Sequence, residues 1–224
     1  MPLKHPLATL LAILPACAFD AQAGASLYVD DAAITPAGHC QAESWARVRA
    51  PGQAFTVVPA CHWAGTEFGL GISRERNPSQ GPQFDLGIKR PLRAVESRRW
   101  GVAWSVGAGW DGARHRPTGW NLNLPASFAA DREQRTWIHA NLGWNQPRDA
   151  SGALTGGLGI EHAFGERWSV LAEIFGERHG GADAQLGARR TLGDSASLDL
   201  LLGSQEGLRD APWITLGFNV LLPH

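Results

Sequence analysis

Hydrophobic and polar positions alternate with a period of two along this chain, most clearly between Trp100 and Trp110. In that stretch the even positions are large or apolar, and nearly every odd position is small or polar. A period of two over this length predicts a β-strand of membrane-crossing reach, with one face toward an apolar medium and the other toward a wet or crowded interior.

The same alternation recurs in short segments separated by turn residues, with no linker or low-complexity tract that would divide the chain into domains. Tight connections alternate with longer polar ones, which is typical of bacterial outer-membrane barrels, although those at 91–98 and 125–134 are long enough for a short helix. We predict an all-β fold, an up-and-down antiparallel transmembrane β-barrel of about twelve strands, an even number that suits closure. The predicted strands are 39–49, 53–63, 66–74, 82–90, 99–110, 118–124, 135–144, 153–163, 167–177, 183–191, 196–203 and 212–222.

The amino terminus predicts export. Residues 1–23 begin with positive charge, continue with a short apolar core and end in Ala21-Gln22-Ala23, which fits a secretory signal peptide and its cleavage site. An alternative lipobox-like interpretation would leave Cys17 lipidated. No segment approaches about 18 uninterrupted apolar residues, so no membrane-spanning helix is expected. We expect residues 24–224 to form a single barrel domain in the outer membrane of a Gram-negative bacterium.

The carboxyl end supports this location. Residues 215–222 resemble the final-strand signal by which outer-membrane barrels are recognised for insertion, except that Pro223 and His224 replace the usual terminal aromatic residue. The expected partners are therefore outer-membrane lipid and the barrel assembly machinery.

Two cysteines remain after the predicted signal peptide, and an even number in an exported protein favours a disulfide. An antiparallel register that pairs Cys40 with Cys61 centres a hairpin between Ala50 and Pro51, where turn-forming residues stand. We predict a structural disulfide; the alternative is two reduced, buried thiols.

Composition and motifs exclude several classes of function. The formal net charge is -1 and the arginines are scattered, so nucleic acid is not an expected partner. No G-x-S-x-G, H-E-x-x-H, C-x-x-C or P-loop pattern is present, and we expect no metal and no cofactor.

The two faces of the predicted strands differ in chemistry. The outward positions are apolar, and six tryptophans near strand ends suit the headgroup layer of a membrane: Trp63, Trp100, Trp110, Trp144, Trp168 and Trp213. The inward positions are polar or tiny and carry both signs of charge. The candidates to line the lumen are Glu43, Arg47, Glu67, Asp85, Lys89, His139, Asn141, Glu161, Glu173 and Arg189.

These inward residues allow two interpretations. Opposite charges inside a barrel should pair, because an isolated charge away from bulk water is costly, and pairing alone would make a filled structural or binding barrel. Alternatively, inward glycines leave space for a narrow passage. In it, arginine or lysine side chains opposite carboxylates would orient a zwitterionic or anionic solute.

Catalysis is a third possibility, since some outer-membrane barrels are lipid hydrolases. His139 and Asn141 share an inward face, but their strand offers no serine on that face and Ser151 belongs to a loop. We expect no enzyme; an outer-membrane lipid-modifying hydrolase is the alternative, with His139 the first residue to test.

Four short motifs carry a family resemblance: Asp30-Asp31-Ala32, Ala140-Asn141-Leu142-Gly143-Trp144, Leu171-Ala172-Glu173-Ile174-Phe175-Gly176 and Trp213-Ile214-Thr215-Leu216-Gly217. They resemble the outer-membrane barrel family labelled "MetA-pathway of phenol degradation". The resemblance implies a barrel with a solute-passage role and transfers no catalytic residue or phenol specificity. Together with the strand pattern, it leads us to expect a narrow channel or transporter-like protein for small solutes.

Overall fold

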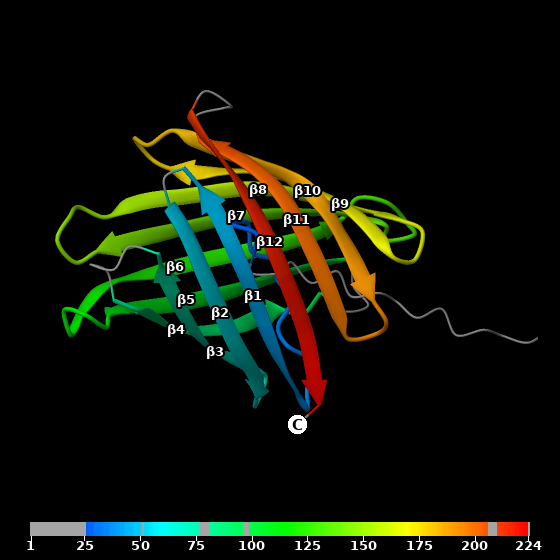
Figure 1. Ribbon diagram of the computed structural model, residues 1–224. Helices are drawn as coiled ribbons and strands as arrows, with labels where there is room; N and C mark the ends of the chain where they lie inside the picture. The colour runs from blue at the N-terminus through cyan, green and yellow to red at the C-terminus, as the bar shows by residue number, and fades with distance from the viewer. Residues whose placement is uncertain (1–25, 51, 77–80, 96–98, 206–209, 224) are drawn as a thin grey trace, which may run out of the picture.

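The computed structural model describes residues 26–50, 52–76, 81–95, 99–205 and 210–223, and within these ranges every regular element is a β-strand. Twelve strands form a closed barrel in which each strand pairs antiparallel with its neighbours in sequence (Figure 1). The predicted fold is confirmed. The strands are β1 (His39–Arg49), β2 (Gly52–Trp63), β3 (Thr66–Glu75), β4 (Gln83–Arg93), β5 (Trp100–Asp111), β6 (Arg116–Ala129), β7 (Thr136–Pro147), β8 (Ala153–Phe164), β9 (Trp168–Glu177), β10 (Ala182–Leu192), β11 (Ala196–Gln205) and β12 (Asp210–Pro223).

Pairing of β1 with β12 closes the barrel. The register runs without a break from His39 opposite Pro223 to Arg49 opposite Trp213. Closure leaves no sheet edge with unpaired backbone groups, which is the condition for a β-structure to span a bilayer. The predicted terminal signal, residues 215–222, lies within β12; its recognition by an assembly machinery stays a prediction.

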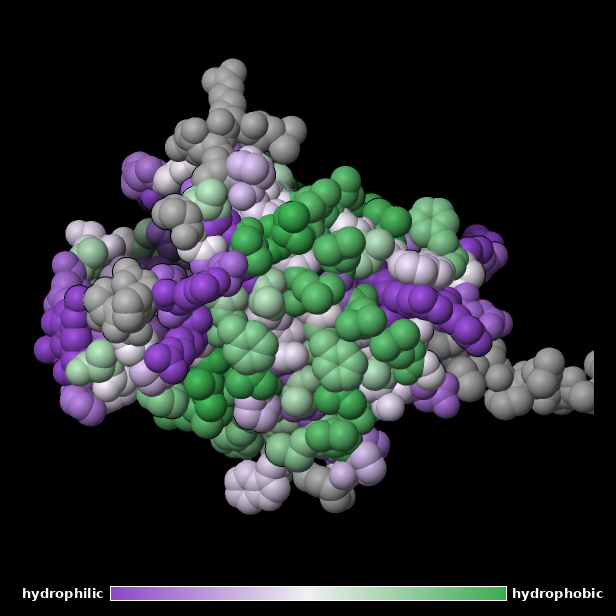
Figure 2. All heavy atoms as spheres, viewed as in Figure 1, coloured by the Kyte–Doolittle hydropathy of each residue, from purple (hydrophilic) through white to green (hydrophobic). Residues whose placement is uncertain are grey.

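The outer surface of the barrel is apolar because the period-two pattern places one face of every strand outside. Leu158, Leu200 and Leu216 are each more than half exposed there. Figure 2 shows apolar residues covering the middle of the visible face, with hydrophilic residues gathered toward its ends. The described residues include no helix long and apolar enough to cross a membrane.

Five of the six strand-end tryptophans are exposed, as headgroup-layer residues should be: Trp63, Trp100, Trp110, Trp144 and Trp168. The prediction is wrong for Trp213, which is only 3% exposed and donates its indole N–H to Gln185 Oε1 at 3.2 Å. Trp213 is in phase with Thr215 and Gly217, so alternation along β12 turns it inward.

Strand β6 is longer than predicted because it continues through a proline. Pro125 pairs with Asn141 of β7, whereas the ladder between β5 and β6 passes from Asn123 to Ala126 without it. Proline lacks the N–H that a ladder needs, and the disturbance is confined to one side of the strand. No helix occurs in the described parts of the two long connections.

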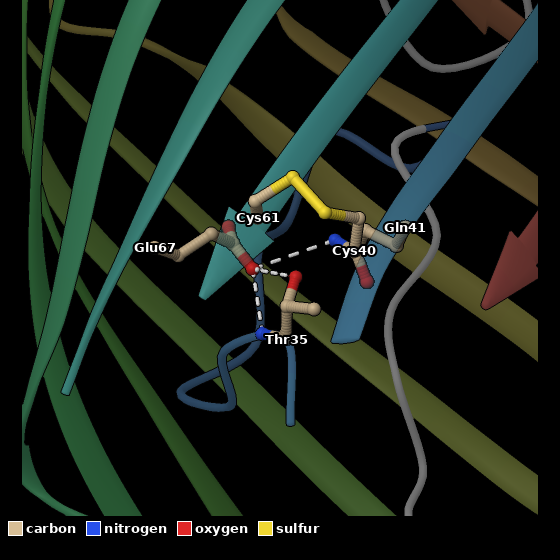
Figure 3. Close-up of a disulfide and its surroundings, with 5 residues drawn as sticks. All are labelled: Thr35, Cys40, Gln41, Cys61 and Glu67. Atoms are coloured by element: carbon tan, nitrogen blue, oxygen red, sulfur yellow. Dashed lines mark hydrogen bonds between the residues drawn. A yellow bond between two sulfur atoms is a disulfide. The ribbon is translucent and has the colours of Figure 1, made fainter. Parts of the chain in front are cut away.

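The disulfide is confirmed. Cys40 and Cys61 face each other in the β1–β2 register and are bonded (Figure 3). They lie near the barrel end that holds the start of β1 and the end of β12. The tight turn at this end has positive φ at both Ala64 and Gly65, as a type I′ hairpin requires.

Candidate functional site in the barrel lumen

The segment that precedes β1, residues 26–38, lies inside the barrel, and we call it the lumenal segment. Ser26, Val29, Ala32 and Thr35 are almost fully buried. The segment has hydrogen bonds or ion pairs with strands around the barrel: β1, β3, β4, β6, β7, β9, β10 and β11. The sequence does not predict this placement, because the segment has no alternation that would mark it as part of the barrel.

Two strand carboxylates hold the backbone of this segment. The oxygens of Glu173 accept the N–H groups of Tyr28 at 2.7 Å and of Val29 at 3.0 Å. Glu67 accepts both the N–H and the hydroxyl of Thr35, each at 2.6 Å (Figure 3). Hydrogen bonds to an ionised acceptor are stronger than neutral ones, so these acids fasten the two ends of the segment.

Asn141 on β7 binds the middle of the segment as a neighbouring strand would. Its Oδ1 accepts the N–H of Asp30 at 2.8 Å, and its Nδ2 donates to the carbonyl of Asp30 at 2.7 Å. Asn123 of β6 donates a further hydrogen bond to the same Oδ1 at 3.1 Å. Both backbone groups of Asp30 are thereby satisfied without a sheet ladder.

An ion pair adds a charged link between the segment and β4. Lys89 Nζ lies 2.8 Å from Asp30 Oδ1 and 3.4 Å from Asp31 Oδ1. The lysine side chain is 12% exposed, and those of the two aspartates are 36% and 5% exposed. Removing one partner of this ion pair would leave the opposite charge unpaired inside the barrel, where water solvates it poorly.

A second ion pair lies deeper in the wall. Arg189 on β10 binds both oxygens of Asp199 on β11, at 2.7 and 2.9 Å, and lies 3.5 Å from Glu161. The segment joins this group through Ser26, whose hydroxyl donates to Asp199 at 2.7 Å. All these side chains are buried, so this group is paired interior charge.

Aromatic residues surround the first residues of the segment. The Tyr28 ring stacks on Phe175 at 4.0 Å between centroids, and the Arg47 guanidinium lies 4.4 Å from the Tyr28 centroid and donates to its hydroxyl oxygen. Trp213 contacts Tyr28 edge-on at 6.4 Å.

A serine–histidine pair that was not predicted from the sequence contacts the lumenal segment. Ser127 of β6 faces His139 of β7 in register, and its hydroxyl lies 2.9 Å from His139 Nδ1. Ser127 Oγ also accepts the Ala32 N–H at 2.8 Å, which links the pair to the lumenal segment. Extending the predicted strand through Pro125 would have revealed the pair. Ser127 and His139 are 1% and 3% exposed, so neither reaches a substrate in this arrangement.

One wall of the lumen is built from glycine. Gly69, Gly87 and Gly107 stand opposite one another on β3, β4 and β5 at inward positions. A Cβ atom at Gly87 would meet no other atom within 4 Å, so space remains open beside this wall. Asp85, next along β4 on the same face, is exposed.

Two cavities lie at opposite ends of the lumenal segment. The terminal-end cavity, at the end that holds the start of β1, has a volume of about 390 Å³ and reaches Pro36, Glu43 and Arg189. The loop-end cavity, at the other end, has a volume of about 550 Å³ and reaches Tyr28 and Phe175. The segment therefore separates two chambers.

The predicted lumen residues divide by environment. Glu67, Lys89, Asn141, Glu173 and Arg47 contact the lumenal segment, and His139 reaches it through Ser127. Glu161 pairs with Arg189, Glu43 lines the terminal-end cavity and Asp85 stands on the glycine wall. The expectation that the interior is only polar or tiny is wrong, because four large apolar side chains are buried there: Trp137, Leu171, Leu201 and Trp213.

The fold is a closed twelve-strand antiparallel β-barrel, and solved structures of porins share it. Among solved structures, it is similar to "KdgM porin" with a TM-score of 0.64 and 6% sequence identity, over 80% of this chain and 98% of that chain. It is also similar to "KdgM porin in complex with disordered oligogalacturonate", with a TM-score of 0.64 and 8% identity over the same shares, and to a "NanC porin structure" with a TM-score of 0.60 and 6% identity over 81% and 98%. Identities this low show the fold alone.

A family model described as "Uncharacterised conserved protein UCP029691" matches residues 10–222, and the chain belongs to this family. The expected resemblance to the "MetA-pathway of phenol degradation" barrels is not confirmed, since the matching model is a different one. Among curated protein sequences, none is significantly similar to this chain.

Proposed function

We propose that this protein is a narrow outer-membrane channel for small hydrophilic solutes, closed at rest by the lumenal segment. The observation that carries the proposal is that residues 26–38 divide a polar lumen into two chambers. Their contacts with the strands are hydrogen bonds, ion pairs and packing, all of which can be exchanged for contacts with water or solute.

The geometry suits a movable closing element. The segment continues directly into β1, whose first residues are tied to β2 by the Cys40–Cys61 disulfide. Displacement of residues 26–35 would therefore leave the barrel intact and stop at this anchor. The glycine wall leaves open space beside Gly87. A solute can pass through this space once the ion pair between Asp30 and Lys89 is broken.

A filled structural barrel is the second candidate. Contacts from the segment to strands on all sides favour it, because a permanently held segment would brace the barrel from within. The two candidates differ in a single property, which is whether the closed state opens at all.

Single-channel conductance separates them. Residues 24–224 and a variant that lacks residues 26–36 would be refolded, shown to form closed barrels by their heat-dependent electrophoretic shift, and inserted into planar bilayers. We expect small, intermittent conductance steps for the full chain and larger, longer openings for the deletion variant. Ala37→Ser, at an exposed position of the same segment, should behave like the full chain. Silence from the folded full chain, even while the deletion variant conducts, would support the filled barrel.

A further inference from the structure

We infer that the loop-end cavity is a binding site for a neutral polyhydroxylated solute of the size of a mono- or disaccharide. The inference deepens the proposed function and rests on it for the role of the bound solute. The cavity volume of about 550 Å³ lies in the range of pockets that take small molecules. Its floor is the lumenal segment, through Tyr28 and through Asn141, which holds Asp30.

The lining offers both donors and acceptors on short, well-held side chains. Asn123, Asn141 and Thr155 supply amide and hydroxyl groups, while Glu177 and Asp183 supply carboxylates. Glu177 is positioned by a hydrogen bond of 2.9 Å from Asn145. Adjacent hydroxyl groups of a polyol both donate and accept, so they match a wall that offers amide, hydroxyl and carboxylate groups.

An aromatic surface completes the chemistry. Phe175 and Tyr28 both line the cavity and stack on one another, so each fixes the position of the other. The C–H face of a pyranose ring is apolar and packs on aromatic carbon while its hydroxyl groups point sideways. A solute without such a face would leave this surface uncovered.

Glycine gives the cavity its space and its backbone access. Gly157, Gly176 and Gly181 all line it. A Cβ atom at Gly176 would stand 2.7 Å from the carbonyl oxygen of Gly181, so a side chain there would require the wall to shift. Close approach of bare backbone is a common way of admitting a ligand.

Charge and polarity disfavour anionic and apolar solutes. The described lining residues include two carboxylates and no lysine or arginine, which disfavours an anion. The nearby Arg47 already donates to Tyr28, Thr215 and the carbonyl of Ser26. An apolar solute would desolvate the amides and carboxylates without replacing their hydrogen bonds.

Calorimetric titration of the refolded full chain in detergent tests the inference. The probes are the neutral disaccharides maltose, cellobiose and sucrose, the anion galacturonate and the cation spermidine. We expect millimolar or tighter binding of at least one disaccharide, and galacturonate weaker than it by about tenfold or more. Binding of spermidine or galacturonate in preference to every disaccharide, or of no probe at all, would overturn the inference.

Variants locate the site. Phe175→Ala and Asp183→Leu should each weaken disaccharide binding by about tenfold, while Ser169→Ala, in the terminal-end cavity, should leave it unchanged. An equal loss in all three variants would place binding elsewhere. The two proposals fail separately: a chain that conducts but binds no sugar refutes this inference, and a chain that binds sugar but never conducts refutes the channel.

Discussion

Replacing Lys89 with methionine should release the lumenal segment, because this lysine bridges Asp30 at 2.8 Å and Asp31 at 3.4 Å. Methionine keeps the length of the side chain and removes its charge. Removing one partner of a buried ion pair costs about 3–5 kcal/mol. The Asp30 side chain is 36% exposed and regains part of its hydration, so we take about 2–3 kcal/mol for this site.

This cost falls on the closed state, since Asp30 and Asp31 are hydrated once the segment has left the lumen. At 1.36 kcal/mol for each factor of ten, the ratio of open to closed channels should rise roughly 30- to 150-fold in Lys89→Met. Single-channel recording measures this ratio directly from the open time. Arg90→Met is the matched control, because Arg90 follows Lys89 on β4, is exposed and also carries one positive charge.

A double-mutant cycle with Asp30→Asn tests the cause. If the ion pair holds the segment, the effects of Lys89→Met and Asp30→Asn should not add, because each removes the same interaction. Additive effects, or an open-to-closed ratio in Lys89→Met equal to that of Arg90→Met, would refute the reasoning from the structure.

Three further outcomes are expected. The double variant Cys40→Ser with Cys61→Ser should lose about 3 kcal/mol of stability, because the disulfide spans 21 residues, and it should unfold at lower denaturant with unchanged conductance; an unchanged midpoint would contradict this. Ser127→Ala leaves two buried partners unsatisfied and should cost about 1–3 kcal/mol in the same denaturant titration, and a loss as small as that of an exposed serine would show that the bonds contribute nothing. Hydrogen bonding, first from Thr136, lowers the pKa of Asp131 in the β6–β7 turn to about 2. The contribution of Asp131 to folding stability is therefore complete above the pKa of an unfolded aspartate and is lost as pH falls toward 2. The unfolding temperature of Asp131→Asn should accordingly depend less on pH between about 4 and 2 than that of the parent, and parallel profiles would argue against this linkage.

Much of the barrel followed from local pattern. The disulfide register was predictable because an antiparallel hairpin relates its two strands by a single turn, and Cys40 and Cys61 stand at equal distances from it. Strand ends were less predictable where proline intervened, since Pro125 breaks the ladder on one side only and β6 continues to Ala129. That error hid Ser127, and with it the partner of His139.

The lumenal site was only partly predictable. Alternation predicted which acids and amides face the lumen, but nothing in the sequence gives their partners. Ser26 and Asp199 are hydrogen-bonded across a separation of 173 residues, and Tyr28 and Glu173 across 145. A short segment without a periodic pattern carries no signal for contacts at such range.

The sequence by itself determined a closed antiparallel barrel with an apolar outside and a disulfide at one end, because alternation, turn residues and cysteine spacing act between near neighbours. The tertiary structure alone decided that residues 26–38 occupy the lumen, that Lys89 holds Asp30, and that two cavities remain. The physical reason is that barrel closure brings inward side chains from distant strands around one space. Their pairing there depends on three-dimensional geometry, which no local period encodes.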